Sequence, residues 1–330
     1  MERAPFSVDK HWAAWEEAAA KLQQADRYCS SPYWGLPLMS AFMGSTNPVV
    51  YRNRDGMAVF HEVEIDGVNL HVPCDSMWTL GNPLLSLQPA KMLQALCEYW
   101  ECQGGLHQVT ISGLYQSHPL WRDSLWRRYP AWERPEAGRQ VASLVGGAEG
   151  FLSRRSVNFR SRLRRAVKKA EASGVEVEPF PKQATSERVH EILARVFRIE
   201  AQSWKGQRGQ GIDRGSMASF YRSMLPLLSA QGRLRGLFLR RDGRDLSYLF
   251  GASFAGYFRG LQFSYLESES EADSLGNIGQ WKMIQTLCEE GCQSYDLGQA
   301  MAYKTRWAED WIVSPTRGLQ VGSQGFEPER

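Results

Sequence analysis

Residues 234–265 read LRGLFLRRDGRDLSYLFGASFAGYFRGLQFSY, and this stretch decides the fold of the second half of the chain. Apolar and aromatic residues dominate three runs, at 234–240, 246–254 and 257–265. Asp242-Gly243 separates the first two runs, and Ala255-Gly256 separates the last two. Because glycine accepts a positive φ without steric cost, both steps suit tight turns between antiparallel strands. The sequence therefore predicts three strands joined by hairpin turns.

Helical spacing of apolar residues flanks these strands on both sides. Upstream it predicts helices at 157–173, 185–203 and 216–230, with a short strand at 175–179. Downstream, a loop at 266–276 leads into a helix at 277–290 and a short buried strand at 294–297. Gly291 suits the end of that last helix, because helices commonly end at a glycine.

The first half of the chain mixes both kinds of element. The predicted helices and strands are helices at 11–25, 34–42, 89–101 and 120–128, and strands at 49–52, 57–65, 68–73, 108–112 and 140–145. Gly146-Gly147 then marks the boundary between the halves. The mixture of strands and helices predicts an α+β fold.

Composition excludes several classes of protein. The 330 residues are 43% hydrophobic, which is enough for a sizeable core, and no run approaches the ~18 apolar residues of a membrane span. The six cysteines form no C-x-x-C, and no histidine set has metal-ligand spacing. No P-loop, dinucleotide fingerprint or G-x-S-x-G is present. We expect a cytoplasmic protein with reduced thiols and no bound metal.

Positive charge is concentrated in one segment. Residues 151–175 hold eight basic residues against one acid, Glu171, and so carry +7, whereas the whole chain carries +3. Arg160, Arg164 and Lys168 recur at four-residue spacing, so their repulsion destabilises an isolated helix. Three interpretations stay open: a solvated face with internal ion pairs, a site for a phosphate-bearing ligand, or a nucleic-acid surface.

Four sets of residues carry a resemblance to a known family. In chain order they are Asn158-Phe159-Arg160-Ser161-Arg162-Leu163-Arg164-Arg165-Ala166, Ser203-Trp204-Lys205-Gly206, Tyr265 with Leu275-Gly276, and Tyr295-Asp296-Leu297-Gly298 with Tyr303-Lys304 and Trp307. With the order of elements, they resemble the CelD-type acetyltransferase group of the GNAT superfamily, which is related to the FemAB/FemX aminoacyltransferases. In the first half, Ser31-Pro32 and Gly81-Asn82-Pro83-Leu84-Leu85 resemble the degenerate first domain of such proteins.

The resemblance implies a fold and a reaction. The fold is α+β, with mixed, largely antiparallel sheets and flanking helices in a tandem GNAT-like architecture. It would have a degenerate GNAT-like domain at 1–146 and a GNAT acyltransferase domain at 147–330. The reaction is direct transfer of an acetyl or other acyl group from acyl-CoA, with acetyl-CoA the default donor. The acceptor would be the amine of a small molecule or a peptide.

A donor site follows from the resemblance. In the GNAT fold two diverging strands bind the pantetheine arm, and the next helix points its N-terminus at the pyrophosphate. The free N–H groups and the dipole of a helix N-terminus favour an anion there. The matching residues are Leu275, Gly276, Asn277, Gly279 and Lys282, and an ordinary turn and helix start is the structural alternative.

This segment also departs from the family pattern. The usual phosphate loop opens with Arg or Gln and holds more glycines. Here an acidic stretch precedes it, containing Glu267, Glu269, Glu271 and Asp273. We expect these carboxylates either to face solvent or to meet a cationic acceptor.

Three of the four candidate catalytic residues follow the phosphate helix, and the fourth, Tyr265, ends the strand before the acidic loop. Asp296 is a candidate general base or amine anchor, and Tyr303 and Tyr265 are candidates for the phenol that protonates the departing thiolate. Lys304 completes the set, and an Asp296–Lys304 ion pair is the structural alternative.

Substrate-binding candidates lie outside that set. Trp204 and Lys205 precede the glycine-rich segment 206–211 and are expected to line the acceptor site, although a tryptophan there could equally fill the core. Arg160 and Arg164 are candidates for binding the CoA 3′-phosphate or a phosphorylated acceptor.

Two other functions stay open. A FemX-like enzyme would take its acyl group from aminoacyl-tRNA, and the basic helix supports this, although no long coiled-coil insertion is present. A non-catalytic binding protein on a decayed GNAT fold is supported by the sparse phosphate loop and its acidic neighbours.

Overall fold

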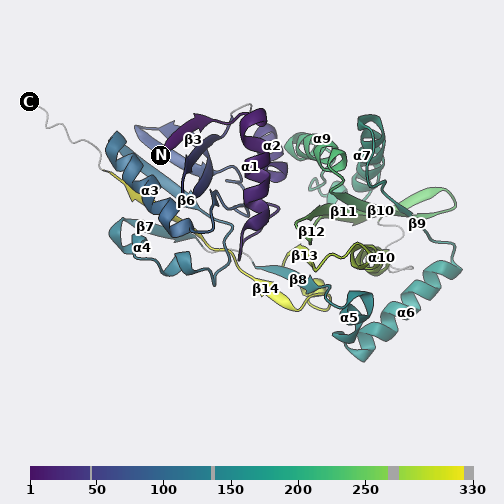
Figure 1. The fold of residues 1–330 in the computed structure, drawn as a ribbon. Helices are drawn as coiled ribbons and strands as arrows, with labels where there is room; N and C mark the ends of the chain where they lie inside the picture. The colour runs from purple at the N-terminus through teal and green to yellow at the C-terminus, as the bar shows by residue number, and fades with distance from the viewer. Residues whose placement is uncertain (45–46, 135–137, 267–274, 323–330) are drawn as a thin grey trace, which may run out of the picture. The chain divides into compact units, whose positions relative to one another are not determined.

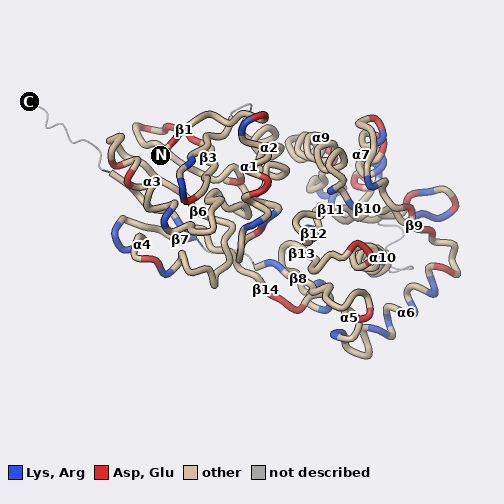
Figure 2. Tube along the Cα trace, viewed as in Figure 1, with Lys and Arg blue, Asp and Glu red and all other residues tan. Residues whose placement is uncertain are grey.

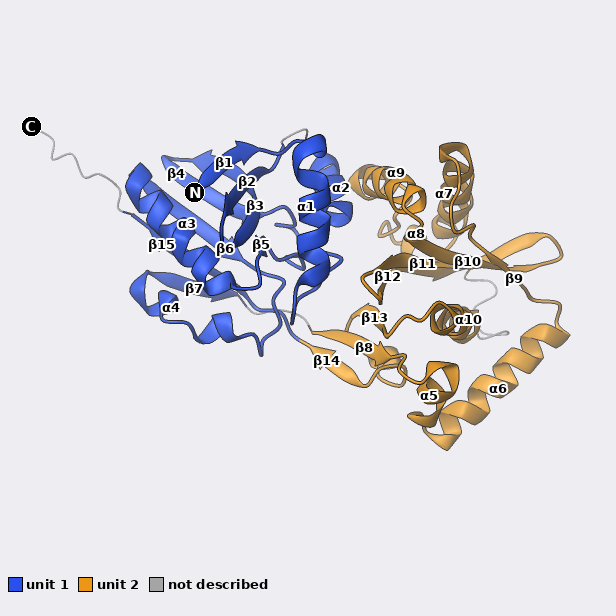
Figure 3. Cartoon of the chain, viewed as in Figure 1, with its two compact units in different colours: residues 1–137, 313–330 blue, residues 138–312 orange. Residues whose placement is uncertain are grey.

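The computed structural model describes residues 1–44, 47–134, 138–266 and 275–322. The chain divides into two compact units, each built on a sheet with flanking helices (Figures 1 and 3). Unit 1 comprises Met1–Ala137 with Val313–Arg330, and unit 2 comprises Gly138–Ile312. The sequence placed a single boundary at 146/147 instead. The difference arises because the strand after residue 138 joins the sheet of unit 2, and the last strand returns to unit 1.

Within the described residues, unit 1 holds an eight-stranded sheet in the order β1-β2-β3-β4-β6-β15-β7, with β5 paired to β3. Its pairs are antiparallel except β4 with β6. The elements are β1 Glu2–Pro5, α1 Val8–Lys21, α2 Pro32–Phe42, β2 Val49–Asn53, β3 Gly56–Ile65, β4 Val68–Pro73, β5 Leu84–Leu85, α3 Pro89–Gln103, β6 Leu106–Ile111, η1 Pro119–Arg122, α4 Leu125–Arg128, β7 Ala131–Arg134 and β15 Thr316–Val321.

The described part of unit 2 holds a seven-stranded sheet in the order β14-β8-β13-β12-β11-β10-β9. Strands β12 and β13 run parallel, and the other pairs are antiparallel. The elements are β8 Arg139–Ser143, α5 Gly147–Ser153, α6 Val157–Ala172, β9 Glu176–Pro179, α7 Ser186–Ala201, α8 Trp204–Gln207, α9 Gly215–Ala230, β10 Leu234–Arg241, β11 Arg244–Phe254, β12 Tyr257–Tyr265, α10 Leu275–Glu289, β13 Ser294–Gln299, η3 Ala302–Lys304 and β14 Asp310–Ile312. The predicted α+β class with largely antiparallel sheets is confirmed.

The hairpins expected at 234–265 are present. Asp242 and Gly243 have φ of 50° and 75°, and Ala255 and Gly256 have φ of 49° and 80°. Two successive residues with positive φ are typical of the turns whose twist matches that of antiparallel strands. The strand predicted at 257–265 has the observed bounds of β12.

The sheet of unit 2 is covered on both faces (Figure 1). Helices α7 and α9 pack on one face, and α10 packs against β10, β11 and β12 on the other, with α5 and α6 behind it. The central strands are correspondingly buried, and Leu239 and Phe250 are both 0% exposed. This double covering explains why β11 and β12 read as long apolar runs rather than as alternating ones.

Two expectations from the sequence were wrong or incomplete. The helix predicted at 120–128 is two short pieces, η1 and α4, because Asp123 interrupts it and accepts a hydrogen bond from Leu125 N at 2.9 Å. Strands β1, β5, β7, β14 and β15 were not anticipated. The acidic residues Glu267, Glu269, Glu271 and Asp273 lie outside the described residues.

Candidate acyl-transfer site

Strands β12 and β13 separate partway along their length. They pair in parallel through Tyr257–Ser294, Phe258–Tyr295 and Arg259–Asp296. Beyond that register β12 continues to Tyr265 and β13 to Gln299 without further pairing between the two. Backbone N–H and C=O groups on the facing edges are therefore left for another partner, which makes this divergence the candidate binding element.

The start of the divergence is built from a bulge and a glycine. The register of β12 with β11 shifts between Phe250 and Gly251, so Leu261 is an extra residue on β12. A bulge of this kind bends its strand. At the neighbouring position a Cβ on Gly260 would lie 2.8 Å from the ring of Tyr295, so only glycine allows the two strands to approach there.

Asp296 lies at the last paired position and is held by two arginines. Its Oδ2 contacts Nη1 of both Arg139 and Arg259, and its Oδ1 accepts from Gly298 N at 2.7 Å. Burial would raise the pKa of Asp296, but the charges of Arg259 and Arg139 and the Gly298 N–H outweigh it and hold that pKa below its usual range. A carboxylate held in this way is a weak base, so this geometry favours a structural role.

Lys304 lies beside the same divergence, paired differently from the ion pair considered from the sequence. Its Nζ donates to Gln299 O at 2.9 Å rather than to Asp296. Burial, with a smaller contribution from the charges of Arg259 and Lys205, lowers its pKa to about 8, although the charge of Asp296 opposes this shift. An ammonium with this pKa is largely charged at neutral pH and can give up a proton at little cost.

Two phenols accompany Lys304. Tyr303 is 46% exposed, and Tyr265 ends β12. Burial raises the pKa of Tyr303, and the charge of Tyr265 raises it further.

Lys205 lies on α8, next to α7, and its side chain reaches β12. Its Nζ donates to Phe263 O at 2.8 Å and to Gln262 Oε1 at 3.3 Å. Burial lowers the pKa of Lys205, and the charge of Glu200 opposes this. Trp204 is only partly buried, and the guanidinium of Arg208 lies 5.5 Å from its ring centroid, so Trp204 does not fill the core.

The N-terminus of α10 contains the residues expected to bind the donor. A Cβ on Gly276 would lie 3.3 Å from the Phe263 ring, and one on Gly279 would lie 3.9 Å from Phe263 and Leu239, so both glycines face the sheet. Leu275 is buried at 1% exposure, and Asn277 Oδ1 accepts from Arg306 at 3.4 Å. The first N–H groups of any α-helix have no partner within it, so this end of α10 offers donors to an anion.

Lys282 and the basic helix α6 lie apart from the diverging strands. Lys282 Nζ is 3.9 Å from Glu171 of α6, and Arg160 Nη1 donates to Leu152 O at 3.5 Å. Arg164 is exposed, and Lys and Arg follow α6 along its length (Figure 2).

Part of the positive charge of residues 151–175 is internal. Arg154 Nε and Arg155 Nη1 contact Glu309 Oε1 at 2.9 and 2.8 Å. The interpretation as internal ion pairs therefore describes this part of the segment.

Three site residues were missed in the sequence. Arg139 and Arg259 form the cluster with Asp296, and Glu200 lies beneath Lys205. Glu200 could have been recognised in the sequence, because it follows Val196 by four residues and so lies on the apolar face of α7. The structure shows that its side chain is indeed 0% exposed. The two arginines could not have been recognised, since their contact with Asp296 joins residues far apart in the chain.

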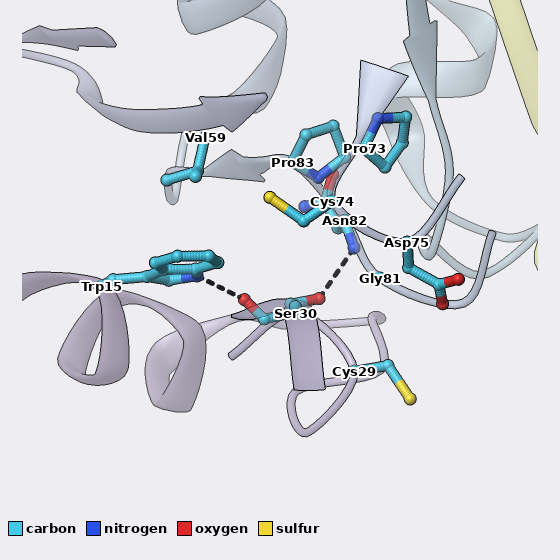
Figure 4. Close-up of a pocket in the computed structure, with 11 residues that line it drawn as sticks. Trp15, Cys29, Ser30, Val59, Pro73, Cys74, Asp75, Gly81, Asn82 and Pro83 are labelled. Carbon is cyan, nitrogen blue, oxygen red and sulfur yellow. Dashed lines mark hydrogen bonds between the residues drawn. The ribbon is translucent and has the colours of Figure 1, made fainter. Parts of the chain in front are cut away.

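In unit 1, Cys29 and Ser30, which precede Ser31-Pro32, pack against Gly81-Asn82-Pro83 (Figure 4). Asn82 N donates to Ser30 Oγ at 2.9 Å, and Trp15 Nε1 donates to Ser30 O at 2.7 Å. A Cβ on Gly81 would lie 2.3 Å from Cys29 O. The cavity between these residues measures about 10 Å³, room for about one water molecule. This close packing indicates a structural role for these residues in unit 1.

Within the described residues, no group of three or more His, Cys, Asp or Glu side chains is arranged to hold a metal ion. Over the same residues, the helices are all too short or too polar to cross a membrane.

Comparison with known proteins agrees with the fold. Residues 157–305 match the model of the acetyltransferase (GNAT) domain family. The structure is similar to that of FemX, with 11% identity, 96% of this chain and 97% of that chain covered, and a TM-score of 0.66. It is also similar to a conserved protein of unknown function from Bacteroides thetaiotaomicron VPI-5482, with 12% identity, 97% and 99% covered, and a TM-score of 0.62.

A third similar structure is the C-terminal domain (DUF2156) of a putative lysylphosphatidylglycerol synthetase from Agrobacterium fabrum. It has 12% identity, 95% and 92% of the two chains covered, and a TM-score of 0.55. No curated protein matches the chain. At these identities the structural likeness shows the fold, and the family match covers the segment that carries the diverging strands. Residues 157–305 therefore form a GNAT acetyltransferase domain, and the fold of the whole chain is similar to that of FemX.

Proposed function

We propose that the chain transfers an acyl group, by default acetyl, directly from acyl-CoA to the amine of a small molecule or a peptide. The observation that carries the proposal is the separation of β12 from β13 after Arg259 and Asp296, beside the N-terminus of α10. The part of β12 that no longer pairs with β13 suits the amides of the pantetheine arm, although Lys205 already donates to Phe263 O there, and the N-terminus of α10 suits the pyrophosphate. The six cysteines are all free, which fits a reducing compartment such as the cytoplasm.

The reaction proceeds through an oxyanion and a departing thiolate, and the protein must stabilise the first and protonate the second. The nitrogen of a neutral amine attacks the thioester carbonyl, whose oxygen becomes an oxyanion. The C–S bond then breaks, the departing thiolate takes a proton from a phenol, and the proton that the amine nitrogen loses restores that phenol. The ammonium groups of Lys304 and Lys205 stand at the divergence and suit the oxyanion. Tyr303 suits the proton donor, with Tyr265 the alternative phenol.

In this proposal Asp296 is a structural residue and not the general base that its position in the sequence suggested. Arg139 and Arg259 hold its carboxylate at the last paired register, so its part is to fix where the two strands separate. Leu275, Gly276, Asn277 and Gly279 stay candidates for donor binding through the backbone of α10. Trp204 stays a candidate for lining the acceptor site. Lys282, Arg160 and Arg164 are candidates only for outlying phosphates, because Lys282 contacts Glu171 of α6, Arg160 contacts Leu152 of α5, and Arg164 is exposed on α6.

An aminoacyl-tRNA donor is the second candidate, and the exposed cations of α6 favour it. Binding of a polyanion through such cations weakens steeply with salt. A bound acyl-CoA, held partly by backbone groups, depends on salt less.

The experiment is an acyl-transfer assay. The chain is incubated with acetyl-CoA and a panel of primary amines and amino-terminal peptides, and both free CoA and acylated amine are measured. Release of CoA that depends on an amine, with matching N-acyl product, supports the proposal. Transfer from aminoacyl-tRNA, with no transfer from any acyl-CoA, supports the second candidate.

A further inference from the structure

We propose that Glu200 is a positioning residue of the acyl-transfer site, and that its buried carboxylate keeps Lys205 charged and fixed against the diverging part of β12. The inference rests on the proposed function, because it assigns a role in acyl transfer to Lys205. It concerns a residue that lies beneath the site and does not touch the reacting groups.

Glu200 is a buried charge with an incomplete set of partners. It is 0% exposed, and its Oε2 accepts a hydrogen bond from Tyr248 Oη at 2.7 Å. Its Oε1 is buried and has no hydrogen-bond partner in the described part of the chain. The nearest cation is Lys205 Nζ, 3.9 Å from that oxygen. A buried carboxylate costs several kcal/mol of desolvation unless a charge compensates it, so Glu200 and Lys205 act as a pair.

The local backbone brings this pair together. Ser203 Oγ donates to Glu200 O at 2.8 Å and accepts from Gly206 N at 3.2 Å, which ends α7 and begins α8. A Cβ on Gly206 would lie 2.1 Å from Glu200 O, so only glycine allows α8 to close on the end of α7. This tight reversal places Lys205 directly over the Glu200 carboxylate.

The other end of the Lys205 side chain meets the site. Its Nζ donates to Phe263 O and to Gln262 Oε1, and Gln262 Nε2 donates in turn to Tyr221 Oη at 2.9 Å. The bond to Tyr221 fixes which way the Gln262 amide faces. An ammonium has three N–H bonds, so one remains for a ligand or for Glu200. A continuous polar chain therefore runs from Tyr248 through Glu200 and Lys205 to β12.

The charges around Lys205 show what Glu200 contributes. Glu200 of α7 is the acid that opposes the effect of burial on the pKa of Lys205. Lys304, after β13, repels Lys205, while Tyr248 of β11 and Tyr221 of α9 stay neutral because burial raises both of their pKa values. The charge of Asp213, just before α9, also raises the pKa of Tyr248. Without Glu200, burial and Lys304 would both favour a neutral Lys205, which is a poor partner for an oxyanion.

The first test measures the charge of Lys205 directly. The full chain is labelled with ¹³Cε-lysine, the Lys205 signal is assigned from Lys205→Arg, and its titration midpoint is followed by NMR. In Glu200→Gln, which keeps the size of the side chain and an acceptor for Tyr248, the midpoint should move to lower pH. Glu191→Gln, an exposed position on the same helix, is the matched control and should leave it in place. If Glu200→Gln does not fold, Glu200→Asp, which withdraws the charge by one methylene, should show a smaller shift in the same direction.

The second test asks whether that charge matters to transfer. The activity of Glu200→Gln relative to wild type should fall as the pH rises from about 6 to about 9.5, because the variant loses the Lys205 proton first. Lys304 is present in both proteins, so its titration largely cancels in the ratio. A residue with only a structural role would lower the ratio equally at every pH.

The outcomes separate the two proposals. An unmoved Lys205 midpoint overturns the inference, and so does a shifted midpoint with a flat activity ratio. A wild-type chain that transfers no acyl group from any acyl-CoA contradicts the proposed function, and the catalytic part of the inference with it. The NMR midpoint still decides, in that case, whether Glu200 holds Lys205 charged.

Discussion

The carboxylate of Asp296 contacts the guanidinium of Arg139, although 157 positions separate the two residues in the chain. Arg139 begins β8 and Asp296 lies on β13, and these strands are neighbours in the sheet of unit 2. Arg259 of β12 completes the cluster on the other side. One carboxylate therefore ties three adjacent strands together at the register where β12 and β13 begin to separate.

Asp296→Asn should destabilise unit 2 rather than remove a base. It leaves Arg139 and Arg259 buried without their counterion, and removing one partner of a buried ion pair costs about 3–5 kcal/mol. Urea denaturation checks this value. A variant as stable as wild type that has lost its activity would instead indicate that Asp296 acts as the general base.

The same cluster predicts how stability depends on pH. The pKa of Asp296 is lowered in the folded state, so its contribution is present above the unfolded-state pKa of about 4 and is lost as pH falls through the folded value. Urea denaturation of wild type between about pH 6 and about pH 3 should show stability falling toward acid. The dependence should be shallower in Asp296→Asn, and equal slopes would show that other carboxylates account for it.

Lys304 should set the alkaline limit of activity. Its pKa is about 8, so if the ammonium stabilises the oxyanion, kcat/KM should decline as the pH passes that value. Lys304→Arg should extend activity to higher pH because arginine stays charged, and Lys304→Met should lower kcat by about 10²–10³-fold. Identical alkaline declines in wild type and Lys304→Arg would assign the limit to another group.

Tyr303→Phe should lower kcat by about 10²-fold while leaving the affinity for acyl-CoA unchanged, because the removed hydroxyl acts on the departing thiolate. Tyr303 is the more suitable phenol because it is half exposed beside Lys304. Tyr265→Phe is the matched control and should have the smaller effect. The reverse order would exchange their roles.

Gly279→Ala should stabilise α10 by up to about 1 kcal/mol, because alanine is the better helix former and the added methyl meets neighbours at an ordinary 3.9 Å. Since that methyl faces Phe263 and Leu239, the dissociation constant of acyl-CoA should not change. Gly276→Ala, whose added methyl would lie 3.3 Å from Phe263, should be stabilised less. Weaker acyl-CoA binding by Gly279→Ala would show that the bare backbone at 279 touches the donor.

Charge reversal on α6 should separate the two candidate donors. Arg164→Glu with Lys168→Glu alters exposed side chains, so stability should stay within about 0.5 kcal/mol of wild type. Acyl-CoA binding should also be unchanged, and exposed Lys21→Glu in unit 1 serves as the control. Weaker binding of aminoacyl-tRNA, with a salt slope smaller by about one for each phosphate that α6 no longer neutralises, would favour the second candidate.

Local patterns in the sequence predicted most of the elements of unit 2. The strand at 257–265 and the two hairpin turns before it depend on neighbouring residues, so apolar runs and glycine positions were sufficient to predict them. Helix α6 was recovered to within a residue for the same reason, because its apolar spacing and Gly174 both lie within the segment. The return of β15 to unit 1 was not recoverable, because its partners β6 and β7 lie about two hundred residues earlier.

The candidate site was predictable only where one segment supplies it. Asp296, Tyr303 and Lys304 follow one another closely, and Tyr265 ends a strand that could be recognised, so all four could be proposed. The partners of Asp296 could not, since Arg139 and Arg259 reach it from neighbouring strands of the sheet. The sequence could name Asp296 but could not show that two arginines would hold its carboxylate and weaken it as a base.

The most direct test of the central claim is a thermal unfolding titration of the chain with acetyl-CoA, longer acyl-CoAs and free CoA, at low and moderate salt. The account predicts that the transition of unit 2 rises with ligand, because a ligand at about 100 times its dissociation constant adds about 2.7 kcal/mol. That corresponds to a shift of several degrees for a domain of this size, largely retained at moderate salt. No shift with any CoA species would contradict the account, and a shift with aminoacyl-tRNA under the same conditions would identify the other donor.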